Sequence, residues 1–300
     1  NTGFEQYDGV LFLVDEFGKA LDYQSRADKD LYFFQTLADT IQQAGISTLF
    51  VGFLHQGFSE YARDKDTQTQ KEWDKVQGRF RNLGFNPSVD ESLVLVGDAV
   101  SKQQHVFNAF KQHYDGLISL IDNSYGEINR SVSLTNCLPI DPFVSLLLGP
   151  ISRRSYSQNE RSLFGFLASY EKFGFREFLQ SHYQSDALEY PLYDSCHFWD
   201  YMYHNLHHTL VSSVDSKKWL ESCDAVDRAI QKGDTLHVKI TKLVALLSVF
   251  GFNQHIHAKS KVISRYFQAL GFYEKDVSQA IKDLETWSII IYRQKHDAFF

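Results

Sequence analysis

The sequence predicts an α/β domain at the start of the chain, followed by a longer part that is mostly α-helical. Two apolar stretches, residues 9–14 and 46–54, have the length and flanking residues of buried strands, and a helical pattern at 30–43 separates them. After residue 100 the apolar spacing is helical until a short β-stretch near the end of the chain. Strands that alternate with helices are typical of a parallel sheet. The domains that we expect are 1–100, 101–215 and 216–300.

Composition limits the class of protein. A length of 300 residues exceeds one typical domain, and the net charge of −7 argues against binding nucleic acid through overall charge, although local basic patches stay open. Three widely spaced cysteines indicate reduced thiols in a cytoplasmic protein. With no apolar run of about 18 residues, we expect no contact with a membrane. Because the chain starts at Asn1 and has a single Met, we expect it to be a piece of a larger protein.

The first predicted strand runs directly into two acids. Residues 9–14 (Gly-Val-Leu-Phe-Leu-Val) indicate a strand buried on both faces of a parallel sheet, and Asp15 and Glu16 follow at once. Ligands of open α/β sheets bind beyond the carboxyl ends of the strands, where these acids are expected. In nucleotide-hydrolysing proteins the first acid of such a pair holds Mg²⁺, and the second positions or deprotonates the attacking water. The alternative is a strand that ends in two solvated acids.

The second predicted strand ends in His55 and Gln56. A strand, a helix and a second strand with connections of this length form a right-handed βαβ unit, which places the ends of the strands side by side. His55 and Gln56 are therefore expected next to Asp15 and Glu16, where a polar side chain can contact a γ-phosphate or the attacking water. The alternative is that His55 caps the helix that follows.

Two arginines follow a polar, charged stretch at 61–80, which we expect to be an exposed helix or loop. A very short strand at 83–85 and a helix at 87–100 come next. From this place Arg79 or Arg81 can reach the nucleotide of a neighbouring subunit, where arginine stabilises transition-state charge. The alternative is that both are solvated or locally ion-paired.

The middle of the chain offers two further candidate sites. Arg153, Arg154 and Arg161 form the strongest local basic cluster, which can contact phosphates or pair with nearby acids. The histidine-rich stretch from Cys196 to His208 is interpreted as a packed, Tyr-rich helix, because no carboxylate or cysteine recurs at metal-ligand spacing beside it. A short apolar helix at 143–148 lies between prolines.

The end of the chain has a winged-helix pattern. Helices are predicted at 239–250, 260–270 and 274–284, and a strand at 287–292. In DNA-binding proteins of this kind the third helix enters the major groove. Here that helix is rich in acids, which DNA phosphates repel, so the sequence favours a structural or protein-binding role over DNA binding.

In this order the elements resemble the AAA+ ATPases, and in particular the branch shared by initiator-type and STAND signalling ATPases. The resemblance covers nearly the whole chain in the order of elements. The stretch Gln158 to Phe164 is similar to large bacterial ATPases of antiphage defence systems. The motifs that carry the resemblance are the acidic strand end at 11–16, the polar strand end at 48–56 and Gly78-Arg79-Phe80.

The resemblance implies ATP and Mg²⁺ as cofactors, a homo-oligomer with its site between subunits, and a protein or nucleic-acid partner at the winged helix. The phosphate-binding loop Gly-x-x-x-x-Gly-Lys-Ser/Thr is missing, so we expect it upstream of Asn1, in the same protein. The implied function is ATP hydrolysis by in-line attack of water; the alternative is a catalytically degenerate scaffold or a winged-helix regulator. The implied roles are Asp15 as the Mg²⁺ ligand, Glu16 as the base, His55 or Gln56 as the sensor, Arg79 as the arginine finger with Arg81 as substitute, and Arg161 as the phosphate sensor of a helical lid.

Overall fold

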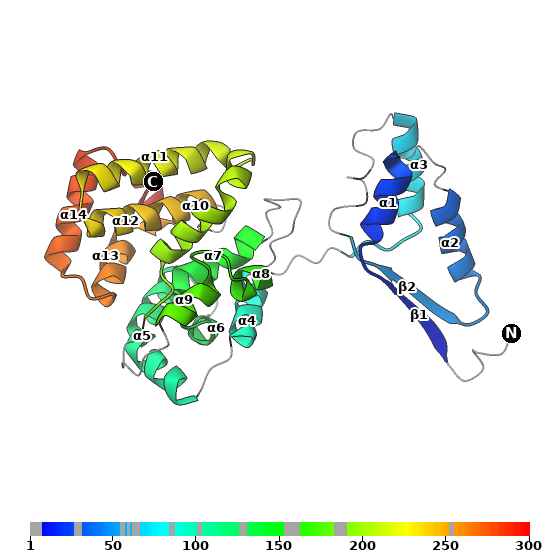
Figure 1. Ribbon diagram of the computed structural model, residues 1–300, viewed down its shortest axis with the longest axis horizontal. Helices are drawn as coiled ribbons and strands as arrows, with labels where there is room; N and C mark the ends of the chain where they lie inside the picture. Colours follow the sequence, from blue (N-terminus) through cyan, green and yellow to red (C-terminus); the bar gives the residue numbers. More distant parts are fainter. Residues whose placement is uncertain are drawn as a thin grey trace. The chain divides into compact units, whose positions relative to one another are not determined.

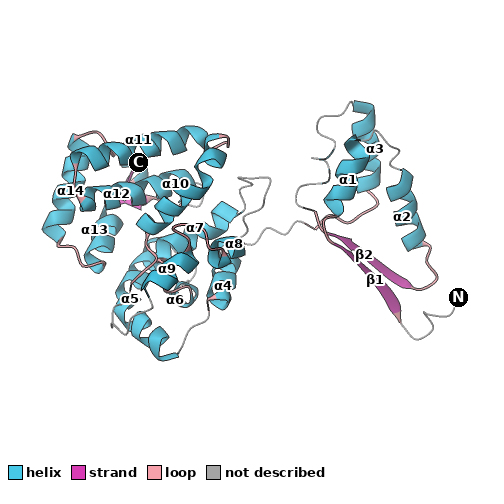
Figure 2. Cartoon of the chain, in the orientation of Figure 1, coloured by secondary structure: helices cyan, strands magenta, loops and turns pink. Residues whose placement is uncertain are grey.

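The computed structural model describes residues 8–26, 32–54, 58, 61, 67–83, 88–100, 104–125, 131–152, 163–182, 191–251 and 255–300. The chain divides into two compact units, Asn1–Phe85 and Asn86–Phe300, each with its own hydrophobic core. Helices predominate in both, and the longest strands lie in the first (Figure 2). The first unit ends well before the domain boundary predicted at residue 100, so the helix that follows Ser88 belongs to the second unit.

The first unit is built on a parallel pair of strands. Its elements in chain order are β1 (Gly9–Val14), α1 (Phe17–Arg26), α2 (Tyr32–Gln42), β2 (Ser47–Gly52) and α3 (Thr67–Gln77). The strands pair in a register that joins Gly9 to Ser47 and Val14 to Gly52, which confirms the predicted parallel pairing. Figure 1 shows α1, α2 and α3 on the same side of the strands. Helix α1 was not predicted from the sequence, and none of the residues described at 81–83 forms a strand.

Aromatic side chains fill the space between these helices and the sheet. The Phe17 ring lies at the centre, with its centroid 5.5 Å from that of Phe34 in α2 and 5.3 Å from that of Phe50 in β2. Both pairs are edge-to-face, the arrangement that aromatic rings favour. Trp73 and Val76 of α3 are buried in the same core. These two are the apolar residues that the sequence shows in its charged stretch, so α3 covers the core with one face.

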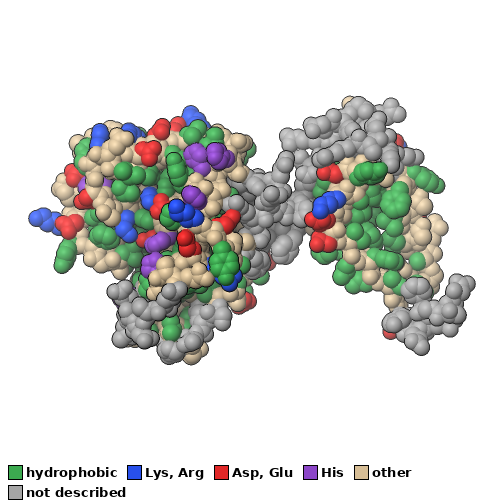
Figure 3. Space-filling view, in the orientation of Figure 1, with side chains coloured by type: hydrophobic (Ala, Val, Ile, Leu, Met, Phe, Trp, Pro, Cys, Tyr) green, Lys and Arg blue, Asp and Glu red, His purple; other side chains and the backbone are tan. Residues whose placement is uncertain are grey.

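The opposite face of the sheet is open, which contradicts the expectation of strands buried on both faces. Leu11, Leu13 and Leu49 are 56 %, 62 % and 59 % exposed. Alternate residues of a strand point to opposite faces, so these odd-numbered side chains point away from the helices. Hydrophobic side chains are visible on the surface of this unit (Figure 3). The prediction of a strand is confirmed. The prediction that both of its faces are buried is wrong, because no described helix covers the second face.

The second unit is almost entirely helical, and its core continues across the domain boundary predicted at residue 215. Among the described helices of the chain, none combines the length and the apolar character that a membrane span needs. The elements in chain order are α4 (Val89–Ala99), α5 (Gln104–Tyr125), α6 (Ser131–Asn136), α7 (Pro142–Ser152), α8 (Leu163–Ala168), α9 (Phe175–His182), α10 (Ser195–Val211), α11 (Ser216–Lys232), α12 (Thr235–Leu246), a π-helical turn (Leu247–Gly251), β3 (Ala258–Lys259), α13 (Ser260–Ala269), α14 (Glu274–Thr286), β4 (Tyr292–Arg293), a 3₁₀ turn (Gln294–His296) and β5 (Ala298–Phe299).

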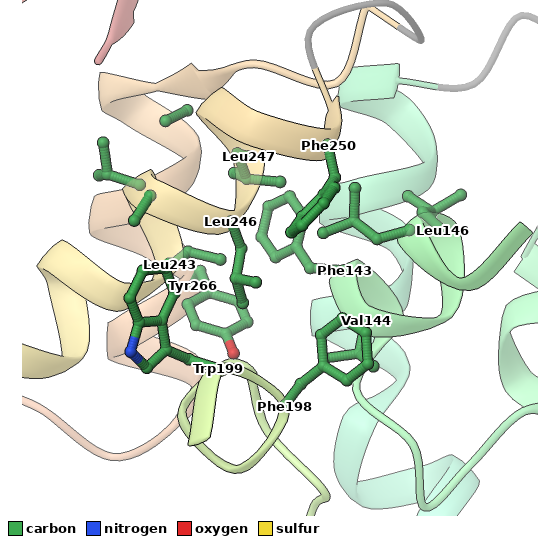
Figure 4. Close-up of a cluster of buried hydrophobic side chains, with 14 of the residues drawn as sticks. Phe143, Val144, Leu146, Phe198, Trp199, Leu243, Leu246, Leu247, Phe250 and Tyr266 are labelled. Carbon is green, nitrogen blue, oxygen red and sulfur yellow. The ribbon is translucent and has the colours of Figure 1, made fainter. Parts of the chain in front are cut away.

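Helix α7 is the centre of this core. Its residues from Pro142 to Ile151 are all buried, as expected of an apolar helix without a polar face. Figure 4 shows Phe143 and Val144 of α7 packed among side chains from α10, α12 and α13. The Phe143 ring centroid lies 5.2 Å from that of Tyr266. The short apolar helix that the sequence predicts at 143–148 is therefore confirmed as a helix, but it is longer than predicted and includes Pro142 and Pro150.

At the end of the chain, β5 lies between β3 and β4 in a small antiparallel sheet; β3 precedes α13, and β4 and β5 follow α14. Helices α12, α13 and α14 precede β4 and β5 as predicted, but each strand has two residues, and the described residues do not show a winged helix. The strand predicted at 287–292 is wrong apart from its last residue. There the chain turns back on α14, and the N–H of Ile289 donates to the Leu284 carbonyl at 2.9 Å. Ile289 and Ile290 are buried at this turn, which explains why the sequence is apolar here although it forms no strand.

Candidate functional site

The two acids Asp15 and Glu16 form the turn between β1 and α1. Phe53, the residue after β2, forms backbone hydrogen bonds with the residues on either side of this turn. Its N–H donates to the Val14 carbonyl at 2.9 Å, and its carbonyl accepts from the N–H of Phe17 at 3.0 Å. The acids therefore stand at the carboxyl edge of the parallel pair, next to the end of β2. Ligands of parallel sheets bind at this edge.

A close contact between the sheet and α1 fixes the position of the turn. Phe17 lies directly on Gly52 at the end of β2, where an added Cβ would come within 2.8 Å of the Phe17 ring. A larger residue at position 52 would displace the ring and with it the start of α1. Phe17 immediately follows Glu16, so this packing holds the acidic turn against the edge of the sheet.

The turn contains one strained residue. Glu16 has a φ of 52°, in the left-handed region, which costs a residue other than glycine about 1–2 kcal/mol. The Asp15 carboxylate accepts the N–H of Glu16 at 2.8 Å through Oδ1, and the Glu16 carboxylate pairs with Lys19 one turn along α1. Both acids are exposed, so a ligand can reach them. Strain of this kind is concentrated at functional sites.

Arg79 lies in the turn after α3, where its guanidinium forms an ion pair with Asp39 of α2. The structure therefore shows the local ion pair that was the alternative for Arg79. Asp39 is in the last turn of α2, close to where the chain enters β2 (Figure 1). Among the described contacts the Arg79 guanidinium pairs with Asp39, and Asp15 and Glu16 make their contacts within their own turn and with Lys19. Arg81, two positions after Arg79, is exposed.

Several predicted site residues lie outside the described part of the chain. They are His55, Gln56, Arg153, Arg154 and Arg161. The structure thus brings Asp15 and Glu16 together at the end of β2 and places Arg79 elsewhere in the same unit. The roles of the sensor pair and of the lid arginine stay predictions.

The histidine-rich stretch forms the packed helix α10, in which Phe198, Trp199 and Met202 are buried. The indole N–H of Trp219 in α11 donates to Nδ1 of His207 at 3.1 Å, so this histidine takes part in helix packing. In the described part of the chain, no group of three or more His, Cys, Asp or Glu side chains can hold a metal ion.

Sequence reasoning missed a buried polar cluster around two helix N-termini in the second unit. Asp141 precedes α7, is fully buried, and accepts the N–H groups of Phe143 and Val144 at 2.8 and 3.3 Å. The hydroxyl of Tyr266 donates to its other oxygen at 2.7 Å. Burial raises the pKa of Asp141 to about 7, although the Tyr266 hydrogen bond lowers it. An Asp just before an apolar helix is an N-cap signal that the sequence does contain.

The second cap in this cluster is Asp194, before α10. It accepts the N–H groups of Cys196 and His197 at 3.0 Å each, and it contacts the His197 ring at 2.7 Å and Lys239 of α12 at 3.2 Å. Burial alone would raise the pKa of Asp194, but the hydrogen bond and charge of His197, with Lys239, hold it well below its usual range. The contact of Asp194 with Lys239 joins α10 to α12, and that of Asp141 with Tyr266 joins the start of α7 to α13.

No protein-family model, curated protein or solved structure matches this chain.

Proposed function

We propose that the first unit is the hydrolytic half of an AAA+/STAND-type ATPase site. The observation that carries this proposal is the pair Asp15 and Glu16 in a strained turn at the carboxyl edge of a parallel strand pair, beside the end of β2. In this proposal Asp15 holds Mg²⁺ and Glu16 orients or deprotonates the water that attacks the γ-phosphate.

The chemistry of these side chains fits a magnesium–nucleotide complex. Mg²⁺ is bound by one or two carboxylates together with waters and phosphate oxygens, and it needs no closed cage of protein ligands. Asp15 uses Oδ1 to accept the Glu16 N–H, which leaves Oδ2 for a metal ion. The nucleotide and its Mg²⁺, when bound, supply the reactive phosphoryl group. The contribution of the chain is to orient two carboxylates toward it from a fixed turn.

The open face of the sheet supports the view that this site is completed by another segment. Parallel sheets normally have both faces covered, and an isolated strand pair is marginally stable. Here Leu11, Leu13 and Leu49 are exposed on one face. We propose that another segment covers this face and supplies the phosphate-binding loop.

Arg79 is proposed to act on the nucleotide of a neighbouring copy in a homo-oligomer. Its guanidinium pairs with Asp39 and is partly exposed, so part of it is accessible to an anion from outside the unit. Arginine supplied in trans raises phosphoryl-transfer rates by about 10³–10⁵.

The test is ATP turnover by the complete protein carrying Glu16→Gln. We expect nucleotide binding to persist and turnover to fall by about 10²–10⁴-fold, the usual effect of removing a general base. The matched control is Glu72→Gln in α3, since Glu72 pairs with Lys75 at the same spacing as Glu16 with Lys19. Turnover by the Glu16 variant equal to that of the control would remove Glu16 from the role of base.

A second candidate function is a scaffold or regulator that binds a protein through the C-terminal helices and hairpin. Tyr273 and Ile291 in this region are 79 % and 58 % exposed, and Glu274 and Asp276 stand in the first turn of α14. These acids favour a protein partner over DNA. Affinity for DNA that falls steeply with added salt would instead support a DNA-binding role.

A further inference from the structure

The ion pair between Arg79 and Asp39 differs from the other ion pairs described in the first unit. Those join residues three positions apart, Glu72 to Lys75 within α3 and Glu16, in the turn before α1, to Lys19 in the first turn of α1, so the local backbone alone brings them together. Arg79 and Asp39 are 40 positions apart in the sequence. Only the packing of α3 against the rest of the unit brings them together, so their contact is a property of the tertiary structure.

The backbone beside Arg79 is anchored in the core. The ring of Phe80 packs against Phe17 and Phe50, with centroid distances of 6.4 and 6.1 Å. The arginine thus starts from a fixed backbone, and Asp39 holds the far end of its side chain. The ion pair therefore favours those rotamers of Arg79 that reach Asp39 before any ligand arrives.

The pair itself adds little to stability, because the two side chains are 37 % and 41 % exposed and such pairs are screened by water. Its geometry, however, leaves the guanidinium able to bind a second anion. A guanidinium has five N–H donors, and the described contact uses Nη1 alone with Oδ1 of Asp39. The remaining donors match the oxygens of a phosphate.

We propose that Asp39 is a positioning residue that orients Arg79 toward the nucleotide of a neighbouring subunit. This inference rests on the proposed ATPase function. Asp39 does not contact the nucleotide; it acts through Arg79, as outer-shell carboxylates orient the groups that bind a ligand. Loss of Asp39 frees the arginine to adopt unproductive rotamers and leaves the rest of the site intact.

The first experiment measures ATP turnover by the complete protein carrying Asp39→Asn, Arg79→Ala or both. We expect Asp39→Asn to lower kcat about tenfold with an unchanged KM for ATP, and Arg79→Ala to lower it by about 10³-fold. The double variant should be no worse than Arg79→Ala alone, since both changes act on one group. Asp39→Glu should restore part of the activity, and Asp74→Asn, an exposed acid in α3, is the control that should not change it.

The second experiment mixes two defective variants. Asp39→Asn has its own acids intact but presents a poorly oriented arginine, whereas Glu16→Gln has a well-oriented arginine but no base. In mixed oligomers some sites combine the intact acids of the first with the intact arginine of the second. We expect the mixture to hydrolyse ATP faster than either variant alone. A merely structural role of Asp39 would not be complemented in this way.

The outcomes separate this inference from the function on which it rests. Full activity of Asp39→Asn, or losses that multiply in the double variant, would overturn the role of Asp39 and leave the ATPase proposal standing. A complete wild-type protein without ATPase activity, or an unaffected Glu16→Gln variant, would overturn the proposed function and this inference together. Activity that is low in Asp39→Asn and not raised by mixing would refute action in trans.

Discussion

Replacing the buried carboxyl of Asp141 by an amide is expected to change how the stability of the protein depends on pH. Burial is the largest cause of the rise in the pKa of Asp141 to about 7, and the nearby charge of Asp194 raises it further. Hydrogen bonds from Tyr266, Phe143 and Val144 act in the opposite direction. In the unfolded chain the pKa of an aspartate is about 3.9.

The sign of the effect follows from proton binding. Between about pH 4 and 7 the folded protein keeps the Asp141 proton while the unfolded chain has released it. The free energy of unfolding therefore falls as the pH rises through this range and levels off above about 7. A difference of about three pH units corresponds to at most about 4 kcal/mol.

The assay is urea unfolding of the wild type and Asp141→Asn between pH 4.5 and 8, followed by tryptophan fluorescence. An Asn side chain can still accept the N–H groups of α7 through its oxygen but cannot ionise. The stability of the variant relative to the wild type should thus rise with pH by at most about 4 kcal/mol and stay constant above about pH 7.5. Tyr266→Phe removes a hydrogen bond that lowers the pKa of Asp141, so the decrease in the free energy of unfolding should continue to higher pH. A constant difference between wild type and Asp141→Asn from pH 4.5 to 8 would refute the reasoning.

Two further predictions concern the second unit. Burial raises the pKa values of the Cys196 and Cys223 thiols to about 12. Both thiols should therefore resist a thiol reagent in the folded protein at pH 8 and react on unfolding. Fast labelling of either cysteine before unfolding would contradict this. Ser88 caps α4 in a capping box with Glu91, so Ser88→Ala should lower the free energy of unfolding by about 1 kcal/mol and Ser88→Gly by only a few tenths. Equal losses in the two variants would show that the hydroxyl cap has no separate effect.

The sequence was informative where local periodicity decides the structure. The parallel pairing of β1 with β2 and the helices near the end of the chain follow from the spacing of apolar residues. The open face of the sheet could not be predicted, because the apolar run at 9–14 looks the same whether or not a second layer covers it. The apolar run at 287–292 misled for a similar reason, since burial under a turn and burial in a strand select the same residues.

The candidate site was predictable only in part. The acids at the end of β1 follow from the strand pattern and the rule for parallel sheets. The ion pair of Arg79 could not be predicted, because Asp39 is 40 positions away and no local sequence pattern joins the two residues. The burial of Asp141 likewise depends on Tyr266, which is 125 positions away. In both cases the chemistry of the group is set by tertiary packing.

The central claim is that a magnesium–nucleotide complex binds at the turn formed by Asp15 and Glu16. The most direct measurement is cleavage of the complete protein by hydroxyl radicals, which Fe²⁺ bound with ATP in place of Mg²⁺ generates from added hydrogen peroxide and ascorbate. The fragments are identified by mass spectrometry. We expect ATP-dependent cuts next to Asp15 and near Phe53, which should be lost in Asp15→Asn and kept in Glu72→Gln. Cuts confined to other parts of the chain, or cuts at this turn that persist in Asp15→Asn, would contradict it.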